Sequence, residues 1–156
     1  MMAGSHVILG VCAWFYVARR MGMPPLDPTA LGIAAAGSLL PDIDHPKSWI
    51  GRRLRVVSVP IAAVFGHRGM THSMFAVVAC IWVLRWDHEH WRVALPLVVG
   101  YASHLAADLF TPAGLCLTWP VRRTFALPLV KTGGFGEQVV VTFVAGWLYA
   151  RSFCGW

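Results

Sequence analysis

Apolar residues occur in five long runs separated by short polar segments. The runs cover about residues 5–18, 29–40, 72–86, 93–110 and 138–153, and a shorter apolar run lies at 56–65. Crossing a bilayer takes about 20 residues. The shorter run cannot do so, and we expect it to be re-entrant or to lie at an interface. The pattern predicts an all-α fold in which loops rich in Gly and Pro connect the helices.

Helix-breaking residues mark several of the expected boundaries. Arg19 and Arg20 close the first run, and a Pro-rich loop follows at 21–28. The second run ends at the helix breaker Pro41. It is rich in Ala and Gly, which suits close packing between helices. Another loop containing Gly and Pro fills 112–136.

The composition indicates a membrane protein with a single domain over residues 1–156. Hydrophobic residues make up 57% of the chain and charged residues 13%. Ordinary globular domains have roughly 25% charged residues. A fold of this size has too much surface to cover with so few charges. We therefore expect a polytopic membrane helical bundle with four to five spans, whose first run is a retained span and not a signal peptide.

The net charge of +6 agrees with this interpretation. Basic residues in membrane proteins flank the spans and meet lipid phosphates, so the expected surroundings include the lipid bilayer. The chain contains no nucleic-acid motif, and we expect no nucleic acid as a partner.

The four cysteines are far apart, which excludes a metal site built from thiolates.

The polar groups converge when the runs are threaded through a membrane one after another. Five of the seven histidines and four of the seven acids then fall on the same side. They are His6, Asp42, Asp44, His45, His67, His72, His104, Asp108 and Glu137. His104 and Asp108 are spaced i, i+4, so both side chains leave one face of a helix. Ionisable groups in such positions are costly unless a cation compensates for them.

Each group alone has a simpler explanation. The His104–Asp108 pair can stabilise a helix, and the acids of "PDIDH" can be solvated at a turn. His6 can be a terminal residue at the interface, and Glu137 can favour a helix N-terminus. The shared face is what favours a metal cluster over these separate explanations.

The ligand types point to a hydrolytic centre. Imidazole and carboxylate suit zinc above all, and also manganese or iron. We expect one or two divalent ions held by all of these residues except Glu137. Asp42, Glu137 and Arg68 are expected to serve the reaction, with Arg68 gripping a phosphate through paired hydrogen bonds or else pairing with a carboxylate. The expected substrate is a phosphoester in an amphiphilic or lipid molecule.

Three segments together carry a family resemblance: "LPDIDH" (40–45), "GHRGMTHS" (66–73) and "SHLAADLFTPAG" (103–114). With His6 they resemble the bacterial membrane-bound metal-dependent hydrolases of the LexA-regulated type. That family is distantly similar to zinc-dependent phospholipases C and single-strand nucleases, whose H-x-x-x-D motif matches His104 and Asp108. Their H-x-x-x-E motif is absent, since Gly133 precedes Glu137 by four residues. The resemblance implies a metal-dependent hydrolase in the bacterial inner membrane.

Two other functions remain open at this point. A metal transporter or metal-binding membrane protein without hydrolase activity would need similar ligands, although transporters place them near the bilayer midplane. A scaffold whose polar cluster only holds helices together needs no metal. The expected position of the ligands, at helix ends and in adjoining loops, favours an enzyme.

Overall fold

The computed structural model is all-helical, as the pattern of apolar runs predicts. It describes every residue except 67–68, 87–90, 117, 120, 122 and 154–156. Within these residues the α-helices are α1 (Ala3–Arg20), α2 (Pro28–Leu39), α3 (Arg55–Phe65), α4 (Met74–Trp86), α5 (Trp91–Leu109) and α6 (Phe135–Phe153). Two short 3₁₀ helices, η1 (Leu40–Asp44) and η2 (Met70–His72), precede α3 and α4. The loop before α6 contains one isolated β-bridge, between Leu115 and Phe125.

Local sequence signals explain both ends of α2. The Asp27 carboxylate accepts a hydrogen bond from the Ala30 amide at 3.0 Å, and Pro28 occupies the first helical position. At the other end Pro41 stands in η1, so the regular helix ends at Leu39 and the chain tightens into 3₁₀ geometry. This turn places Asp42 and Asp44 directly after α2.

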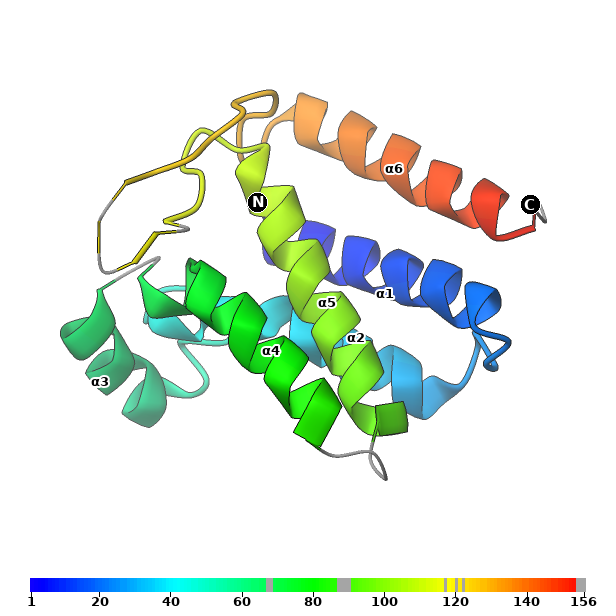
Figure 1. Cartoon of the computed structure of the whole chain (residues 1–156). Coiled ribbons are helices and arrows are strands. Elements are labelled where there is room, and N and C mark those ends of the chain that lie inside the picture. The colour runs from blue at the N-terminus through cyan, green and yellow to red at the C-terminus, as the bar shows by residue number, and fades with distance from the viewer. Residues whose placement is uncertain (67–68, 87–90, 117, 120, 122, 154–156) are drawn as a thin grey trace.

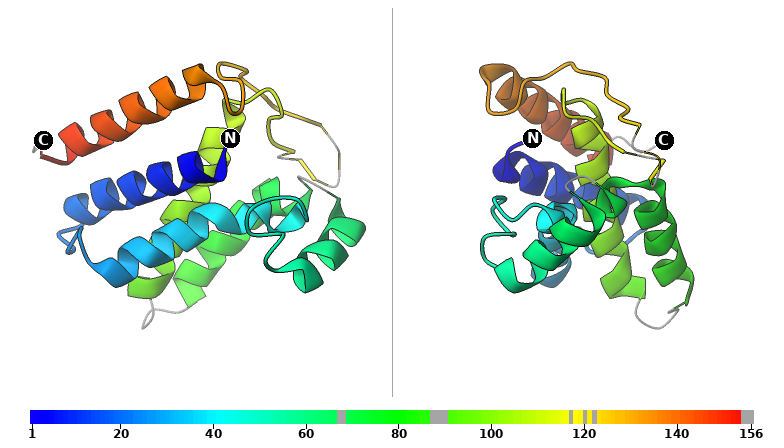
Figure 2. Two further views of the ribbon diagram at one scale, coloured as in Figure 1. Left: turned by 180° about the vertical axis from the view of Figure 1, so that it is seen from behind. Right: turned by 90° about the vertical axis from the view of Figure 1, so that its left-hand side faces the viewer.

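Helices α1, α2, α5 and α6 form the body of the molecule. Helix α2 packs along α5, while α1 contacts α2, α5 and α6 (Figures 1 and 2). Helices α1 and α6 run parallel, with Glu137 bound to Ser5 at one end and Phe15 stacked on Tyr149 at the other. Helix α4 packs on α5, and α3 lies against η1. The parallel pair therefore starts at the end of the molecule where α5 finishes.

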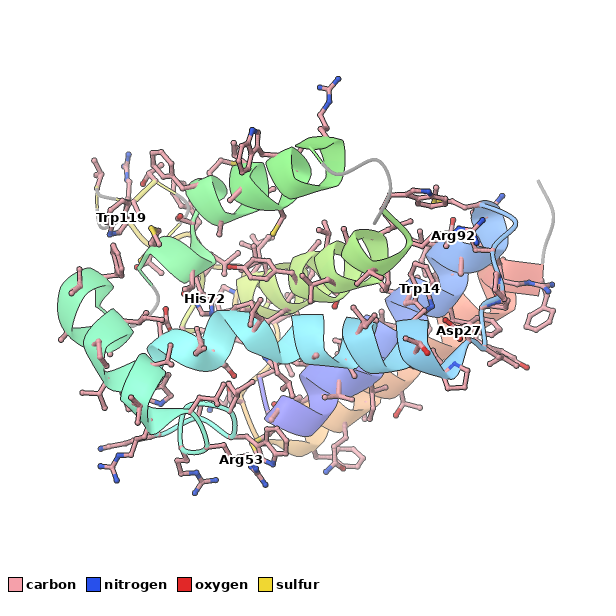
Figure 3. The ribbon with its side chains drawn as sticks, turned by 90° about the horizontal axis from the view of Figure 1, so that it is seen from below. Trp14, Asp27, Arg53, His72, Arg92 and Trp119 are labelled. Atoms are coloured by element: carbon pink, nitrogen blue, oxygen red, sulfur yellow. The ribbon has the colours of Figure 1, made fainter. Side chains whose placement is uncertain are left out.

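Glycines permit the close crossing of α2 and α5. A Cβ atom on Gly37 would lie 2.3 Å from the Leu97 carbonyl oxygen, and one on Gly100 would lie 2.0 Å from that of Ala34. Both distances are far inside van der Waals contact, so only glycine fits without a backbone shift. Trp14 fills the adjoining space among Ala18, Ala30 and Ala34 (Figure 3).

The predicted polytopic membrane bundle with four to five spans is wrong. Within the part of the chain that the structure describes, no helix combines the length and apolarity needed to cross a membrane. Helix α2 has 12 residues, α3 has 11 and α4 has 13. These lengths fall well short of a span, which requires roughly 20 residues. The longer helices α1, α5 and α6 contain buried polar groups such as His6, His104 and Glu137. The expected multi-pass topology is therefore not supported by the described helices either.

Candidate metal centre

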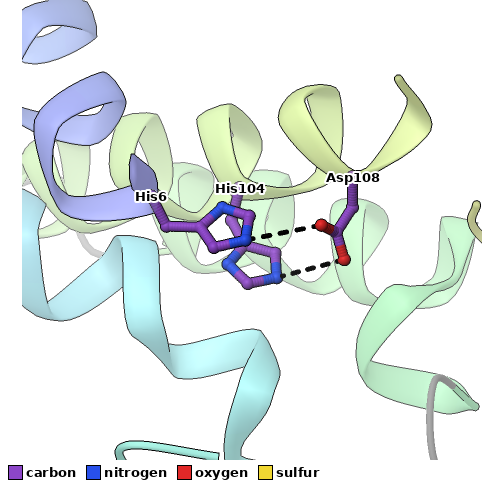
Figure 4. A group of neighbouring side chains, drawn as sticks. All are labelled: His6, His104 and Asp108. Carbon is purple, nitrogen blue, oxygen red and sulfur yellow. Dashed lines mark ion pairs between the residues drawn. The ribbon is translucent and has the colours of Figure 1, made fainter. Parts of the chain in front are cut away.

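Three buried side chains from α1 and α5 form the first part of a polar cluster (Figure 4). His104 and Asp108 are one turn apart on α5, with 3.7 Å between His104 Nε2 and Asp108 Oδ2. His6 of α1 stacks on the His104 ring at a centroid distance of 3.7 Å. Its Nε2 lies 3.4 Å from Asp108 Oδ1. All three side chains are at most 1% exposed, so they face one another and not water.

The tautomer of His104 follows from its backbone partner. His104 Nδ1 lies 2.7 Å from the carbonyl oxygen of Ser38 in α2. A carbonyl oxygen can only accept, so Nδ1 carries the proton and donates it. Burial, reinforced by the neighbouring His6, lowers the pKa of His104 well below its usual range and keeps the ring neutral. Nε2 therefore presents a lone pair to the cluster, the state required of a metal-binding histidine.

His72 enters the cluster from η2 with a carboxylate behind it. Its Nδ1 lies 3.3 Å from Asp44 Oδ2 and 3.0 Å from the Thr71 hydroxyl oxygen. The Thr71 hydroxyl donates to the same Asp44 oxygen. A protonated Nδ1 facing this buried carboxylate leaves Nε2 of His72 as an acceptor. A carboxylate in this position orients metal-binding histidines in many proteins.

The two imidazole acceptors point at one another. His72 Nε2 and His104 Nε2 are 3.3 Å apart. Two nitrogens held by one tetrahedral zinc ion, at about 2.0–2.1 Å each, lie about 3.3–3.4 Å apart. Asp42 Oδ1 is 3.8 Å from His104 Nε2, and Asp108 Oδ2 is 3.8 Å from His72 Nε2. The spacing and the donor types thus fit a divalent cation.

Among the residues that the structure describes, two overlapping sets of three could each hold an ion. In each set one ligand atom per residue lies within 4.8 Å of the others. The sets are His6, His104 and Asp108, and Asp42, His72 and His104. Since His104 belongs to both, the arrangement offers room for one ion or for two close together. The α-amino nitrogen of Met1 lies 2.7 Å from Asp108 Oδ1 and places a further positive charge beside that carboxylate.

The structure places the remaining predicted residues differently. His45 follows η1 but belongs to neither set of three. His67 and Arg68 lie outside the described residues. Asp44 lies on the Nδ1 side of His72, away from the Nε2 atom that faces His104. In this position the carboxylate of Asp44 orients the His72 ring. The role of Asp44 as a metal ligand stays a prediction.

Glu137 has a structural environment at the start of α6. Its carboxylate accepts hydrogen bonds from the amides of Met2 and Gly133 and from the Ser5 hydroxyl. Burial acts to raise its pKa, but these hydrogen bonds outweigh burial, and the pKa is lowered. Glu137 thereby joins the first turn of α1, which carries His6, to the first turn of α6. Its catalytic role stays a prediction.

Sequence reasoning missed the groups that orient the cluster. The Ser38 carbonyl holds His104, but a backbone oxygen leaves no signal in the residue types. The Tyr101 hydroxyl donates to the Thr71 carbonyl and so ties η2 to α5. Tyr101 is three residues before His104, and that helical spacing was the available signal.

Comparison with known proteins gives the chain a family. The family model described as "YdjM inner membrane protein" matches residues 1–155. The chain belongs to the YdjM inner membrane protein family. The description supports the expected inner-membrane location and leaves open the hydrolase activity implied by the resemblance.

Individual relatives extend this assignment. Inner membrane protein YdjM of Escherichia coli (strain K12) is 50% identical over 97 residues, which cover 59% of this chain and 50% of the relative. The YdjM protein of Shigella flexneri gives the same values, so the matched part spans about half the length of these relatives. Uncharacterized protein YvsG of Bacillus subtilis (strain 168) is 34% identical over 142 residues, covering 90% of this chain and 88% of the relative. No solved structure matches the chain.

Proposed function

We propose that this YdjM-family chain is a metal-dependent hydrolase of the inner membrane that cleaves a phosphoester in an amphiphilic or lipid substrate. The observation that carries the proposal is the facing pair of Nε2 atoms on His72 and His104, 3.3 Å apart. Both rings are oriented from behind, His104 by the Ser38 carbonyl and His72 by Asp44. In their neutral forms both rings direct an Nε2 lone pair into the same space, where one cation could bind both.

The donor atoms of the cluster determine which metal ions suit it. His6, His72 and His104 supply imidazole nitrogens, while Asp42 and Asp108 supply carboxylate oxygens. This mixture suits zinc, with manganese or iron as the other candidates, and one or two ions as the expected number. A divalent ion bound here would lower the pKa of a coordinated water towards about 7 and so make a nucleophile available at neutral pH.

Asp42 has the position of a proton acceptor. It is 19% exposed, whereas Asp44 and Asp108 are at most 1% exposed, so Asp42 is the carboxylate of the cluster that water reaches. From η1 it can take a proton from a water molecule entering beside His104. The exposed basic residues Arg52, Arg53 and Arg55 follow η1 along the chain, and they favour an anionic substrate. Arg68 keeps its predicted phosphate-binding role as part of this proposal.

The position of the cluster favours an enzyme over a metal transporter. His6 lies in the first turn of α1, Asp108 in the last turn of α5, and Asp42 and His72 in the 3₁₀ helices. The ligands therefore gather where helices end, while transporters place ligands where helices cross the membrane midplane. Uptake of zinc into proteoliposomes would support the transporter instead.

Metal analysis of the purified chain tests the proposal. We expect one to two equivalents of zinc or manganese by mass spectrometry, and His104→Ala should remove most of it. Ser103→Ala, at the neighbouring position of α5, should keep the wild-type metal content. Asp42→Asn should abolish hydrolysis of a phospholipid or a chromogenic phosphoester while the chain keeps its helical fold. Equal metal in His104→Ala and wild type would overturn the ligand assignment.

A further inference from the structure

An apolar cavity of about 240 Å³ lies beside the cluster, between α1, α5 and α6. Leu9 and Ala13 line it from α1, Ala106 and Ala107 from α5, and Val144 and Leu148 from α6. Ala106 and the lining residue Phe110 are exposed, so the cavity reaches the surface. Its walls offer almost no hydrogen-bonding group, which suits a hydrocarbon and not a polar molecule.

The cavity lies next to the candidate metal centre, and residues adjacent in sequence to its ligands line the wall. Ala107 precedes the ligand Asp108, and Ser103, which also lines the cavity, precedes His104. Leu9 follows His6 by three residues and Ala13 follows it by seven, so both lie on the helical face that carries the ligand. Because α1 and α6 are parallel, Val144 and Leu148 extend the same wall away from the cluster. The apolar cavity therefore ends close to the cluster, where the lining residue Met1 places its α-amino nitrogen 2.7 Å from Asp108 Oδ1.

The size matches an alkyl chain. An apolar cavity of about 150 Å³ holds benzene, so the larger space here accommodates on the order of ten carbon atoms. The rise of α6 from Val140 to Leu148 corresponds to a length of about 12 Å. Small side chains at positions 13, 106 and 107 leave this space open between the three helices.

We infer that this cavity, the alkyl slot, binds the hydrocarbon chain of a membrane amphiphile whose anionic head group lies at the His–Asp cluster. The inference rests on the proposed function, because it assigns the substrate class of the same site. Cluster and slot together would hold both ends of one molecule. Chain length then becomes a determinant of specificity, since each buried methylene strengthens binding up to about fourfold.

Binding to the metal-free chain tests the slot separately from catalysis. The purified full chain, stripped with EDTA, is titrated by calorimetry with n-decyl phosphate and n-butyl phosphate below their aggregation concentrations. We expect the decyl ester to bind at least about tenfold more tightly, because its longer chain buries more methylenes. Equal affinity for the two esters would overturn the inference.

Substitutions then locate the binding site. Ala106→Phe fills the slot and should abolish the preference for the decyl ester, while Ala150→Phe, at an exposed position of α6 outside the slot, should preserve it. Leu148→Ala lengthens the slot and should improve binding of n-dodecyl phosphate relative to the decyl ester, a gain that misfolding cannot produce. The same response in the two phenylalanine variants would contradict the inference.

The two proposals fail in different measurements. If His104→Ala keeps the wild-type metal content, the proposed metal centre is wrong, but the chain-length preference of the EDTA-treated protein is unaffected. If that preference is absent while the metal content is as expected, the alkyl slot is wrong and the hydrolase proposal stands.

Discussion

The imidazole of His104 is constrained on both of its nitrogens. Nδ1 donates to the Ser38 carbonyl, and Nε2 faces His72, Asp42 and Asp108. Protonating Nε2 in this buried site is costly because desolvation, followed by the neighbouring His6, opposes the charge. His104 therefore has a lowered pKa in the folded state and an ordinary pKa of about 6.5 in the unfolded state.

This difference makes the metal-free protein sensitive to acid. Above about pH 6.5 neither state binds the proton, and the full stability is present. As the pH falls below that value the unfolded state takes up the proton first, so stability is lost at up to about 1.4 kcal/mol per pH unit. We expect urea unfolding in EDTA and mild detergent to show a lower midpoint at pH 5 than at pH 7.5.

The histidine responsible can be identified by substitution. His104→Gln should flatten the pH dependence, because glutamine does not titrate. A wild-type midpoint that does not fall towards pH 5 would contradict the assignment, and so would an unchanged slope in His104→Gln.

At the residue scale, five of the predicted ligands lie together in the structure, but sequence reasoning did not show how each is used: His6, Asp42, His72, His104 and Asp108. The i, i+4 spacing was enough to pair His104 with Asp108. It did not separate Asp42 from Asp44, which the sequence shows only as neighbours in "PDIDH" and which both lie in η1. A 3₁₀ helix completes a turn every three residues, so side chains at i and i+2 leave different faces. One carboxylate faces His104 and the other orients His72, and the residue types alone do not show which carboxylate has which role.

At the scale of elements, the crossing of α2 and α5 positions the centre. Helix α2 brings the Ser38 carbonyl to His104, and Gly100 lies one turn before His104 at the point where the helices touch. Any movement of α2 relative to α5 therefore changes the hydrogen bond that orients His104.

Gly100→Ala should destabilise the fold and disturb the site. The added Cβ would lie 2.0 Å from the Ala34 carbonyl oxygen. Overpacking of this kind costs about 1–3 kcal/mol. The matched control is Gly32→Ala, because a Cβ there meets nothing within 4 Å.

The two variants should move in opposite directions in denaturant unfolding. Replacing a helical glycine by alanine without a clash stabilises by about 0.5–1 kcal/mol, so Gly32→Ala should raise the midpoint while Gly100→Ala lowers it. Greater stability of Gly100→Ala would show that the crossing is looser than the structure indicates.

Apolar runs predicted the helices well but predicted the architecture poorly. Each long run became a helix, with boundaries shifted by only a few residues: the run at 29–40, for example, is α2 at Pro28–Leu39. The length of each apolar run was taken as a sign that the run crosses a membrane. In α2 it instead reflects contact with α1 and α5 together, which leaves little room for a polar face. The η1 and η2 turns had no periodic signal, since they are too short to show one.

At the scale of the whole molecule, apolar residues are distributed over the outside as well as the inside. Helix α6 carries an exposed stripe at every fourth position: Phe135, Val139, Phe143 and Trp147. Their exposed fractions are 81%, 50%, 72% and 51%. A contiguous apolar surface of this kind marks an interaction site. The inner-membrane family of the chain makes lipid the expected partner.

The stripe predicts that one charge on α6 weakens association with lipid. Burying a phenylalanine is worth roughly 1.5–3 kcal/mol, so Phe143→Asp should reduce partitioning into vesicles of zwitterionic and anionic phospholipid about tenfold or more. Gln138→Asp adds the same charge to an exposed polar position of α6 and should change partitioning little. Co-sedimentation measures both, with circular dichroism to confirm that each variant keeps its helices. If both variants sediment like the wild type, lipid does not contact the stripe, and the surface that holds the alkyl slot at the membrane must lie on another helix.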